Sequence, residues 1–397
     1  MSLGYRFNRR EFAGSLGDLG TILPLALGMI LVNGLSPEGV FFSMGLFYVL
    51  TGVYYGLTVP VEPMKVIGAY AVATAMTIQQ IQASALLMAG CLLLIGVTGT
   101  MDRFGRYIPK AVVRGIQLST GVLLMVKGIG MITGNSALQG LRQVAEPYLT
   151  FQTLGPLPIG IVIGAAGIAA TLAFLDNRKL PAGLIVIFLG LGTGLVLGTG
   201  EGLDRLAPGI YFPALLPYGF PSGADFSFAV FAVVLPQMPM TLGNAVIAQA
   251  DLSRDYFGDA ARKMTYASLC ISMAFGNALS FLFGGMPMCH GAGGLAAHYR
   301  FGAKTAGSNL MIGALMIGMA ILLGAGLLSV LFLIPMAVLG VLLFFAGSQL
   351  AMTVIDMNTR NEIFVVVTIL SVTLAANLAF GAVAGFLLAW ALKRVDI

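Results

Sequence analysis

The chain has 397 residues, of which 58% are apolar and 9% are charged, and its formal net charge is +5. Ordinary soluble domains carry roughly 25% charged residues, so water cannot be the solvent for most of this surface. The basic excess does not indicate nucleic-acid binding, because Lys and Arg gather in short segments between apolar runs, as in a membrane topology signal.

About fourteen apolar spans follow one another along the chain and leave no stretch long enough for a separate soluble domain. A helix needs about 20 apolar residues to cross the hydrocarbon core of a bilayer, and most of the spans approach that length. We therefore predict an all-α integral membrane fold in which residues 1–397 form a single domain within the lipid bilayer. The predicted spans cover residues 16–32, 38–57, 64–78, 82–99, 109–130, 157–175, 180–199, 226–250, 264–283, 290–300, 307–326, 329–348, 362–377 and 379–392.

The basic residues also predict an orientation. Most of the 21 Lys and Arg residues fall in alternate connecting segments, from Arg9 and Arg10 before the first span to Lys393 after the last. Such segments face the cytoplasm, so both termini are expected there, in a plasma (inner) membrane. No small-residue cleavage site is evident after Arg10, and we expect the first span to remain in the protein.

The first span carries Asp18 a few residues after its start. A charged Asp at the centre of a span costs about 2.5 to 3.5 kcal/mol on insertion scales, so something must compensate it. We interpret Asp18 as a proton or cation site at the edge of a substrate cavity. The alternative is a structural acceptor for nearby backbone amides.

The third and tenth predicted spans are short, and each follows a stretch that proline excludes from continuous helix, with Pro60 and Pro287 at matching places. Irregular backbone at membrane depth must line a cavity or be buried in protein. Paired broken segments therefore indicate a binding site near the midplane. The two half-helices would direct free amides and positive dipole ends at one place, which suits an anion.

The polar stretch 17–24 of the first span has a counterpart at 235–244 in the eighth, two spans before each broken segment. Two halves of seven spans are implied. Because seven is odd, the second half must enter the membrane from the opposite side. The sequence thus predicts two inverted repeats, at residues 12–199 and 226–393.

Polar residues cluster at the third and eighth spans. Glu62 and Lys65, three residues apart, can form a local ion pair; otherwise Lys65 supplies positive charge toward the anion while Glu62 titrates, and one network can combine both roles. Gln237, Thr241 and Asn244 share one helix face. They are either neutral donors to an oxyanion or partners in interhelical hydrogen bonds.

Cys289, His290 and Gly291 begin the tenth span. His290 is a donor whose charge can change near neutral pH, and the alternative is a neutral ring tied to backbone carbonyls. Adjacent Cys and His without an orienting acid do not indicate catalysis, so no enzyme is predicted. The three scattered cysteines indicate neither a disulfide framework nor a metal site, and no cofactor is predicted.

Four motifs together resemble the molybdate transporter family related to the SulP sulfate carriers. They read Gly17-Asp18-Leu19-Gly20-Thr21, Pro60-Val61-Glu62-Pro63-Met64-Lys65, Pro236-Gln237-Met238-Pro239-Met240-Thr241 and Met286-Pro287-Met288-Cys289-His290-Gly291-Ala292-Gly293-Gly294-Leu295. The resemblance implies fourteen spans in two inverted repeats, divided into a core and a gate domain. Many SulP relatives add a cytoplasmic C-terminal regulatory domain, which we expect to be absent here because the last span ends shortly before Ile397.

The resemblance also implies a secondary active transporter that imports a tetrahedral oxyanion by alternating access, with molybdate ahead of sulfate or another small anion. A nucleobase carrier is disfavoured because Cys289, His290 and Gly291 stand where such carriers place a base-binding carboxylate. An anion channel is disfavoured by the repeat symmetry around a midplane site.

No ATP-binding motif is present, so ion coupling is expected, with protons ahead of sodium. The oligomeric state is left open, with a homodimer as one option. The residues expected to carry the coupling ion are Asp18, Glu62 and His290. The residues expected to bind substrate are Thr21, Lys65, Gln237, Thr241, Asn244, Cys289, His290 and Gly291.

Overall fold

The computed structural model describes residues 4–101, 109–175, 177 and 181–394, and its regular structure is almost entirely helical. The first half of the chain forms α1 (Arg9–Ser15), α2 (Leu19–Leu31), α3 (Pro37–Tyr55), β1 (Glu62–Pro63), α4 (Lys65–Thr74), α5 (Ile78–Thr98), α7 (Lys110–Ile132), α8 (Ala137–Arg142), β2 (Thr153–Leu154), β3 (Leu157–Pro158), α9 (Ile159–Phe174) and α10 (Ala182–Leu197). The second half forms η1 (Leu203–Arg205), α11 (Gly223–Ala229), η2 (Val230–Val234), α12 (Leu235–Met240), η3 (Thr241–Ala248), α13 (Gln249–Phe257), η4 (Gly258–Ala261), α14 (Tyr266–Phe283), β4 (Met288–Cys289), α15 (Ala292–Phe301), α16 (Ala306–Leu323), η5 (Gly324–Gly326), α17 (Leu327–Leu331), α18 (Met336–Met352), η6 (Thr353–Asp356), α19 (Arg360–Ala375) and α20 (Leu378–Arg394).

Among the described residues, six helical segments are long and apolar enough to cross a membrane, and the bent pair α1 and α2 makes a seventh. Four further apolar helices, α4, α9, α10 and α20, have 10 to 17 residues. The prediction of an all-α integral membrane fold is confirmed. The count of fourteen spans stays a prediction, because several of the segments are shorter than a full crossing.

The half-helices that the matched prolines predicted are present. α4 and α15 have 10 residues each, which corresponds to about 15 Å, half the thickness of a hydrocarbon core. The strands before them, β1 and β4, pair antiparallel, with Glu62 opposite Cys289 and Pro63 opposite Met288. The starts of α4 and α15 therefore lie side by side, although more than 200 residues separate them in the sequence.

The two halves of the chain interlock. α3 packs against α16, α5 against α14, and α7 against α18. In the last pair a Cβ added at Gly121 would lie 2.5 Å from the carbonyl oxygen of Gly347, and one at Gly128 would lie 2.5 Å from that of Gly340. Glycine at these crossings lets the two backbones touch, which is how helices associate closely in a membrane.

The first and eighth spans, which carry the matched polar stretches, are irregular. α1 and α2 meet at a bend of 45°, and Asp18 is the N-cap residue of α2. In the eighth span η2 and η3 are π-helical and flank α12, which contains Pro236 and Pro239. Proline cannot donate to the helical ladder, so the hydrogen-bonding pattern shifts around it.

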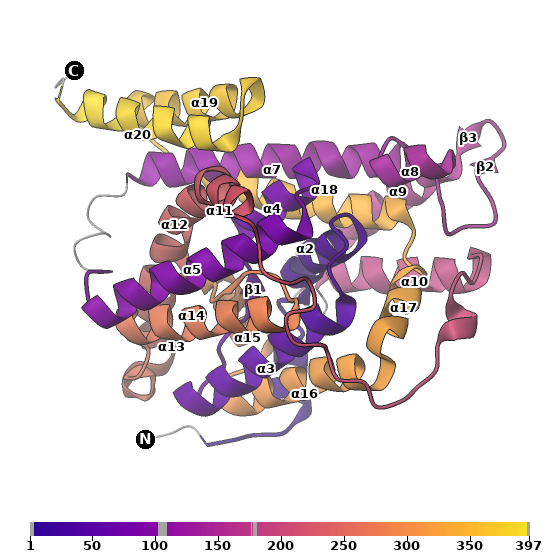
Figure 1. Ribbon diagram of the computed structural model, residues 1–397, viewed down its shortest axis with the longest axis horizontal. Helices are drawn as coiled ribbons and strands as arrows, with labels where there is room; N and C mark the ends of the chain where they lie inside the picture. Colours follow the sequence, from indigo (N-terminus) through magenta and orange to yellow (C-terminus); the bar gives the residue numbers. More distant parts are fainter. Residues whose placement is uncertain (1–3, 102–108, 176, 178–180, 395–397) are drawn as a thin grey trace.

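We call residues 9–98 and 223–323 the core group, and the described residues of 110–197 and 327–394 the gate group. In Figure 1 the gate helices α7, α19 and α20 lie along the top, and the core helices α3, α5, α14 and α16 lie below them. The groups meet where α4 packs against α7 and α2 packs against α18. Lys65 and Gly293, at the starts of the two half-helices, lie at this boundary.

Candidate anion-binding site

A polar cavity of about 400 Å³ lies between the core group and the gate group. We call it the central cavity. Its core wall consists of Asp18, Thr21, Leu25, Glu62, Lys65, Met240, Asn244, Gly293 and Ala297. Its gate wall consists of Arg114, Gln117, Ala346, Gln349, Leu350 and Thr353.

The structure divides the predicted site residues into two sets. Those that line the central cavity are Asp18, Thr21, Glu62, Lys65 and Asn244. Those that do not line it are Gln237, Thr241, Cys289, His290 and Gly291, which are all buried in the core group. Gln237 and Thr241 belong to the eighth span, and Cys289, His290 and Gly291 directly precede α15.

Gln237 caps the half-helix α4. Its Oε1 accepts hydrogen bonds from the backbone N–H groups of Val66 (2.9 Å) and Ile67 (3.2 Å), and its Nε2 donates to Thr241 Oγ1 at 2.9 Å. Orphan amides at a helix start need such a partner. The sequence led us to expect the α4 amides to be free for an anion, whereas here two of them are already bonded to a neighbouring span.

Glu62 is fully buried, and its Oε2 lies 2.9 Å from Lys65 Nζ. The local ion pair allowed by the spacing of three is therefore formed. Side chains added at Gly291 or Gly294 would overlap the Glu62 carboxylate. The carboxylate thus sits against the first turn of α15, where the positive end of the helix dipole stabilises it.

Asp18 reaches the same turn of α15, because a Cβ at Gly294 would overlap Asp18 Oδ2 as well as Glu62 Oε1. Asp18 Oδ2 and Glu62 Oε1 are buried without a hydrogen-bond partner among the described residues. Asp18 makes no side-chain capping bond to α2. Two neighbouring carboxylates out of water repel each other unless protons or cations compensate them.

His290 lies behind this pair with both ring nitrogens occupied. Nδ1 is 2.8 Å from the carbonyl oxygen of Pro60, which can only accept, so Nδ1 carries the proton. Nε2 is 2.9 Å from Ser272 Oγ, and the ring stacks on Phe47 at 5.0 Å between centroids. This arrangement matches the neutral histidine tied to a backbone carbonyl that the sequence left open. Cys289 is buried nearby, with its Sγ 4.0 Å from the carbonyl oxygen of Pro63.

The gate wall was missed by sequence reasoning. Arg114 forms a bidentate ion pair with Asp356, through Nε to Oδ1 at 2.9 Å and Nη2 to Oδ2 at 2.6 Å. Its Nη1 donates to Gln117 Oε1 at 2.8 Å, and Thr353 Oγ1 donates to the same oxygen at 3.0 Å. Arg114 is one of the 21 Lys and Arg residues whose distribution predicts the orientation. Its position one turn inside an apolar span was the available clue.

A family model described as "Molybdate transporter of MFS superfamily" matches residues 10–124 and 229–350, which is more than half of the chain. The chain belongs to this molybdate transporter family. Molybdate transporter 1 of Arabidopsis thaliana is 31% identical over 98% of this chain and 89% of its own length. Molybdate transporter 2 of the same plant is 30% identical over 94% of this chain and 85% of its own length. The resemblance carried by the four motifs is confirmed.

Solved structures identify the fold. The transmembrane domain of a cyanobacterium bicarbonate transporter, BicA, superposes with a TM-score of 0.66 at 16% identity, over 97% of this chain and 98% of that one. The murine anion transporter Slc26a9 in the inward-facing state superposes with a TM-score of 0.68 at 14% identity, over 98% of this chain and 69% of that one. The family member described here therefore has the inverted-repeat fold of these transporters, although the family description names the MFS superfamily. It is an integral membrane anion transporter.

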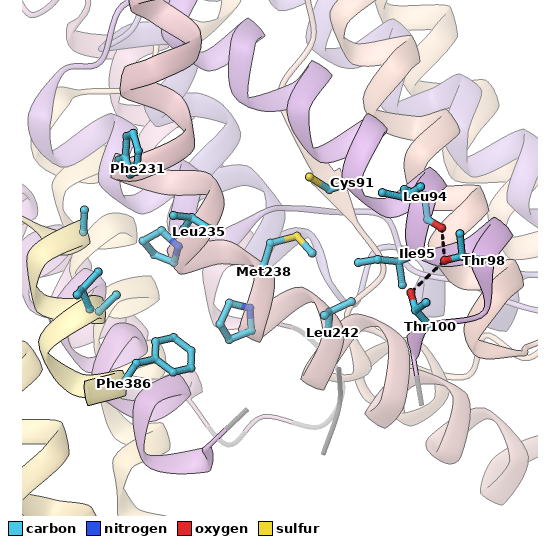
Figure 2. Close-up of a pocket in the computed structure, with 15 residues that line it drawn as sticks. Cys91, Leu94, Ile95, Thr98, Thr100, Phe231, Leu235, Met238, Leu242 and Phe386 are labelled. Atoms are coloured by element: carbon cyan, nitrogen blue, oxygen red, sulfur yellow. Dashed lines mark hydrogen bonds between the residues drawn. The ribbon is translucent and has the colours of Figure 1, made fainter. Parts of the chain in front are cut away.

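A larger cavity than the central one has an apolar lining. It is a groove of about 730 Å³ bounded by α5, the η2–α12 region and α20. Figure 2 shows Phe231, Leu235, Met238 and Phe386 around it, with Thr98 as one of few polar side chains. None of the described residues that line the groove is charged. An oxyanion would lose its hydration there without compensation.

Proposed function

We propose that this protein imports a tetrahedral oxyanion, molybdate in the first place, by alternating access of the core and gate groups, coupled to protons. The observation that carries the proposal is the core wall of the central cavity. There a single cation, Lys65, lies beside Glu62, and Asp18 converges on the same turn of α15. Such an arrangement lets proton binding and anion binding depend on each other.

The dependence follows from charge. While Glu62 is ionised, it competes with a substrate anion for Lys65 at 2.9 Å. Protonation of Glu62 and Asp18 removes two negative charges from the cavity and leaves Lys65 free to bind the oxyanion. Thr21 and Asn244 supply neutral donors on the same wall. We assign the coupling to Asp18 and Glu62, with His290 in a supporting position behind them.

The energetics favour two protons for each oxyanion. Moving a dianion inward against a negative-inside potential requires roughly 4.6 kcal/mol per 100 mV, from about 2.3 kcal/mol for each charge. Two protons carried with it make the transfer electroneutral. The two carboxyl groups provide that number of sites in one place.

The choice of substrate rests on the relatives and on the lining. The similar plant proteins are named as molybdate transporters. Among the residues that the structure describes, those that line the central cavity include no aromatic side chain, so they offer no ring to stack on a nucleobase. Sulfate, a smaller tetrahedral dianion, is the alternative substrate. We propose cytoplasmic termini and an inner membrane location from the distribution of basic residues.

The test is transport by purified protein in proteoliposomes. We expect saturable molybdate uptake and counterflow, stimulated by an inward proton gradient and inhibited more strongly by tungstate than by sulfate. Non-saturable flux without counterflow would contradict the carrier. Uptake that is unaffected by a proton ionophore and depends on a sodium gradient would contradict the proton coupling. Sulfate bound more tightly than molybdate would overturn the choice of substrate.

A further inference from the structure

A second cavity adjoins the central one. It has a volume of about 260 Å³ and is lined by Lys110, Val113, Arg114, Gln117, Pro239, Gly243, Asn244, Ile247 and Ala248. We call it the vestibule. Arg114, Gln117 and Asn244 line both cavities. Lys110, whose side chain is 54% exposed, lies at the start of α7. Arg114 therefore stands at the boundary between the vestibule and the central cavity.

Stability does not explain the ion pair of Arg114. Its side chain is 24% exposed and that of Asp356 is 41% exposed. Ion pairs that water reaches to this extent contribute about 0 to 1 kcal/mol. An arginine one turn inside a membrane helix instead indicates a functional position.

The guanidinium has capacity for another partner. The described hydrogen bonds to Asp356 and Gln117 use three of its five N–H groups. Arginine binds tetrahedral oxyanions through paired N–H groups, as it binds phosphate. Asp356 would not be left uncompensated if Arg114 turned away, because Lys110 Nζ lies 3.0 Å from Asp356 Oδ2.

We propose that Arg114 binds the oxyanion from the gate wall, and that Asp356 is the counter-ion that holds Arg114 while the cavity is empty. This inference rests on the proposed function, and it places one cation on each wall, Lys65 on the core and Arg114 on the gate. Together they match the two charges of a dianion. A bound dianion then bridges the two groups, so that occupancy favours their closing around it.

The test compares two variants that break the same ion pair, Arg114→Gln and Asp356→Asn. Molybdate transport is measured in proteoliposomes, and molybdate binding by titration of the purified proteins. Arg114→Gln is expected to raise KM and Kd roughly tenfold or more, because the charge-assisted contact is lost. Asp356→Asn is expected to lower both constants and to slow turnover, because nothing competes for Arg114. Arg114→Lys keeps the positive charge but lacks the paired N–H groups of the guanidinium, and it should give an intermediate KM.

A purely structural role predicts the same change in both variants, and that result would overturn the inference. If Arg114→Gln does not fold, Asp356→Asn alone tests the inference: lower KM and Kd support it, and unchanged or higher values contradict it. Arg142→Gln is the matched control, since Arg142 forms a similar pair with Glu201, at 2.7 and 2.9 Å, away from both cavities. It should leave KM unchanged. Failure of the wild type to bind molybdate, tungstate or sulfate would contradict the proposed function. If the wild type binds molybdate and the KM and Kd of Arg114→Gln equal those of the wild type, only the role of Arg114 is contradicted.

Discussion

Gln237 Oε1 accepts a hydrogen bond from the backbone N–H of Val66 at 2.9 Å, and this bond joins the eighth span to the start of the half-helix α4. The contact fixes where Lys65 enters the central cavity. It also means that two polar features, which the sequence predicted as separate ligands, satisfy each other. The position of Lys65 depends on a residue 172 places further along the chain.

Gln237→Leu is expected to weaken molybdate binding strongly and to lower thermal stability. The substitution leaves the buried N–H groups of Val66 and Ile67 without an acceptor, at about 1 to 3 kcal/mol for each group. Gln237→Glu, which keeps an acceptor oxygen, should recover part of the stability. Binding titrations and melting of the purified variants measure both effects, and wild-type values in Gln237→Leu would contradict the capping role.

Thr241→Val is expected to have a smaller effect than Gln237→Leu. It removes only the acceptor for Gln237 Nε2, at 2.9 Å, and leaves the two bonds to α4 intact. The expected result is a modest rise in KM at normal expression. A loss as large as that of Gln237→Leu would instead assign Thr241 a direct contact with substrate.

Gly294→Ala is expected to abolish transport, because the new methyl group would overlap the carboxylates of Glu62 and Asp18. Either α15 or the carboxyl pair must then move. Gly318→Ala, also within a core helix, is the matched control, since a Cβ there meets nothing within 4 Å. Uptake assays at equal protein levels measure the difference. Equal activity of the two variants would show that transport does not require the Asp18 and Glu62 carboxylates to contact the first turn of α15.

Asp18→Asn is expected to abolish concentrative uptake while sparing exchange of molybdate across the membrane. The neutral side chain mimics the protonated acid, so substrate still binds, but one coupling proton is lost. In the wild type, uptake should rise as external pH falls. Paired measurements of net uptake and counterflow test this, and a variant that still concentrates molybdate under a proton gradient would remove Asp18 from the coupling.

Glu146 provides a test of stability against pH. It lies between α8 and β2, is fully buried, and accepts the N–H groups of Met336 and Ala337 at 2.8 Å each, at the start of α18. Burial raises the pKa of Glu146 to about 7 from an ordinary 4.5, against the lowering effect of the two amides. The folded protein thus holds a proton that the unfolded chain has lost between these pH values. The stability that Glu146 contributes is therefore fully present below pH 4.5, and it is lost as the pH rises through about 7.

We therefore expect the wild type to melt at lower temperature at pH 8 than at pH 5. Glu146→Gln should flatten this dependence, because its amide oxygen still accepts a hydrogen bond and no longer titrates. Glu201→Gln, at a site 41% exposed, is the control and should keep the wild-type slope. Identical slopes in all three proteins would mean that Glu146 stays ionised across the range.

The membrane class and the two broken spans could be predicted from the sequence alone, and the spacing of Glu62 and Lys65 allowed the ion pair that is formed. Each of these depends on neighbours along the chain. Long apolar runs require a lipid solvent, Pro60 and Pro287 interrupt a helix wherever they stand, and a spacing of three keeps two side chains within reach. The four motifs were also local in sequence, and they were sufficient to recognise the family.

Which groups face the central cavity depends on how distant helices pack. Helical spacing placed Gln237 and Thr241 on one face, but it could not say that this face covers the start of α4. Nor could it show that His290 is held by the carbonyl of Pro60, or that Arg114 stands across a cavity from Lys65. These outcomes depend on contacts between the two halves of the chain and between the core and gate groups. A sequence pattern fixes the polarity of a helix face, whereas the packing of distant helices fixes what that face meets.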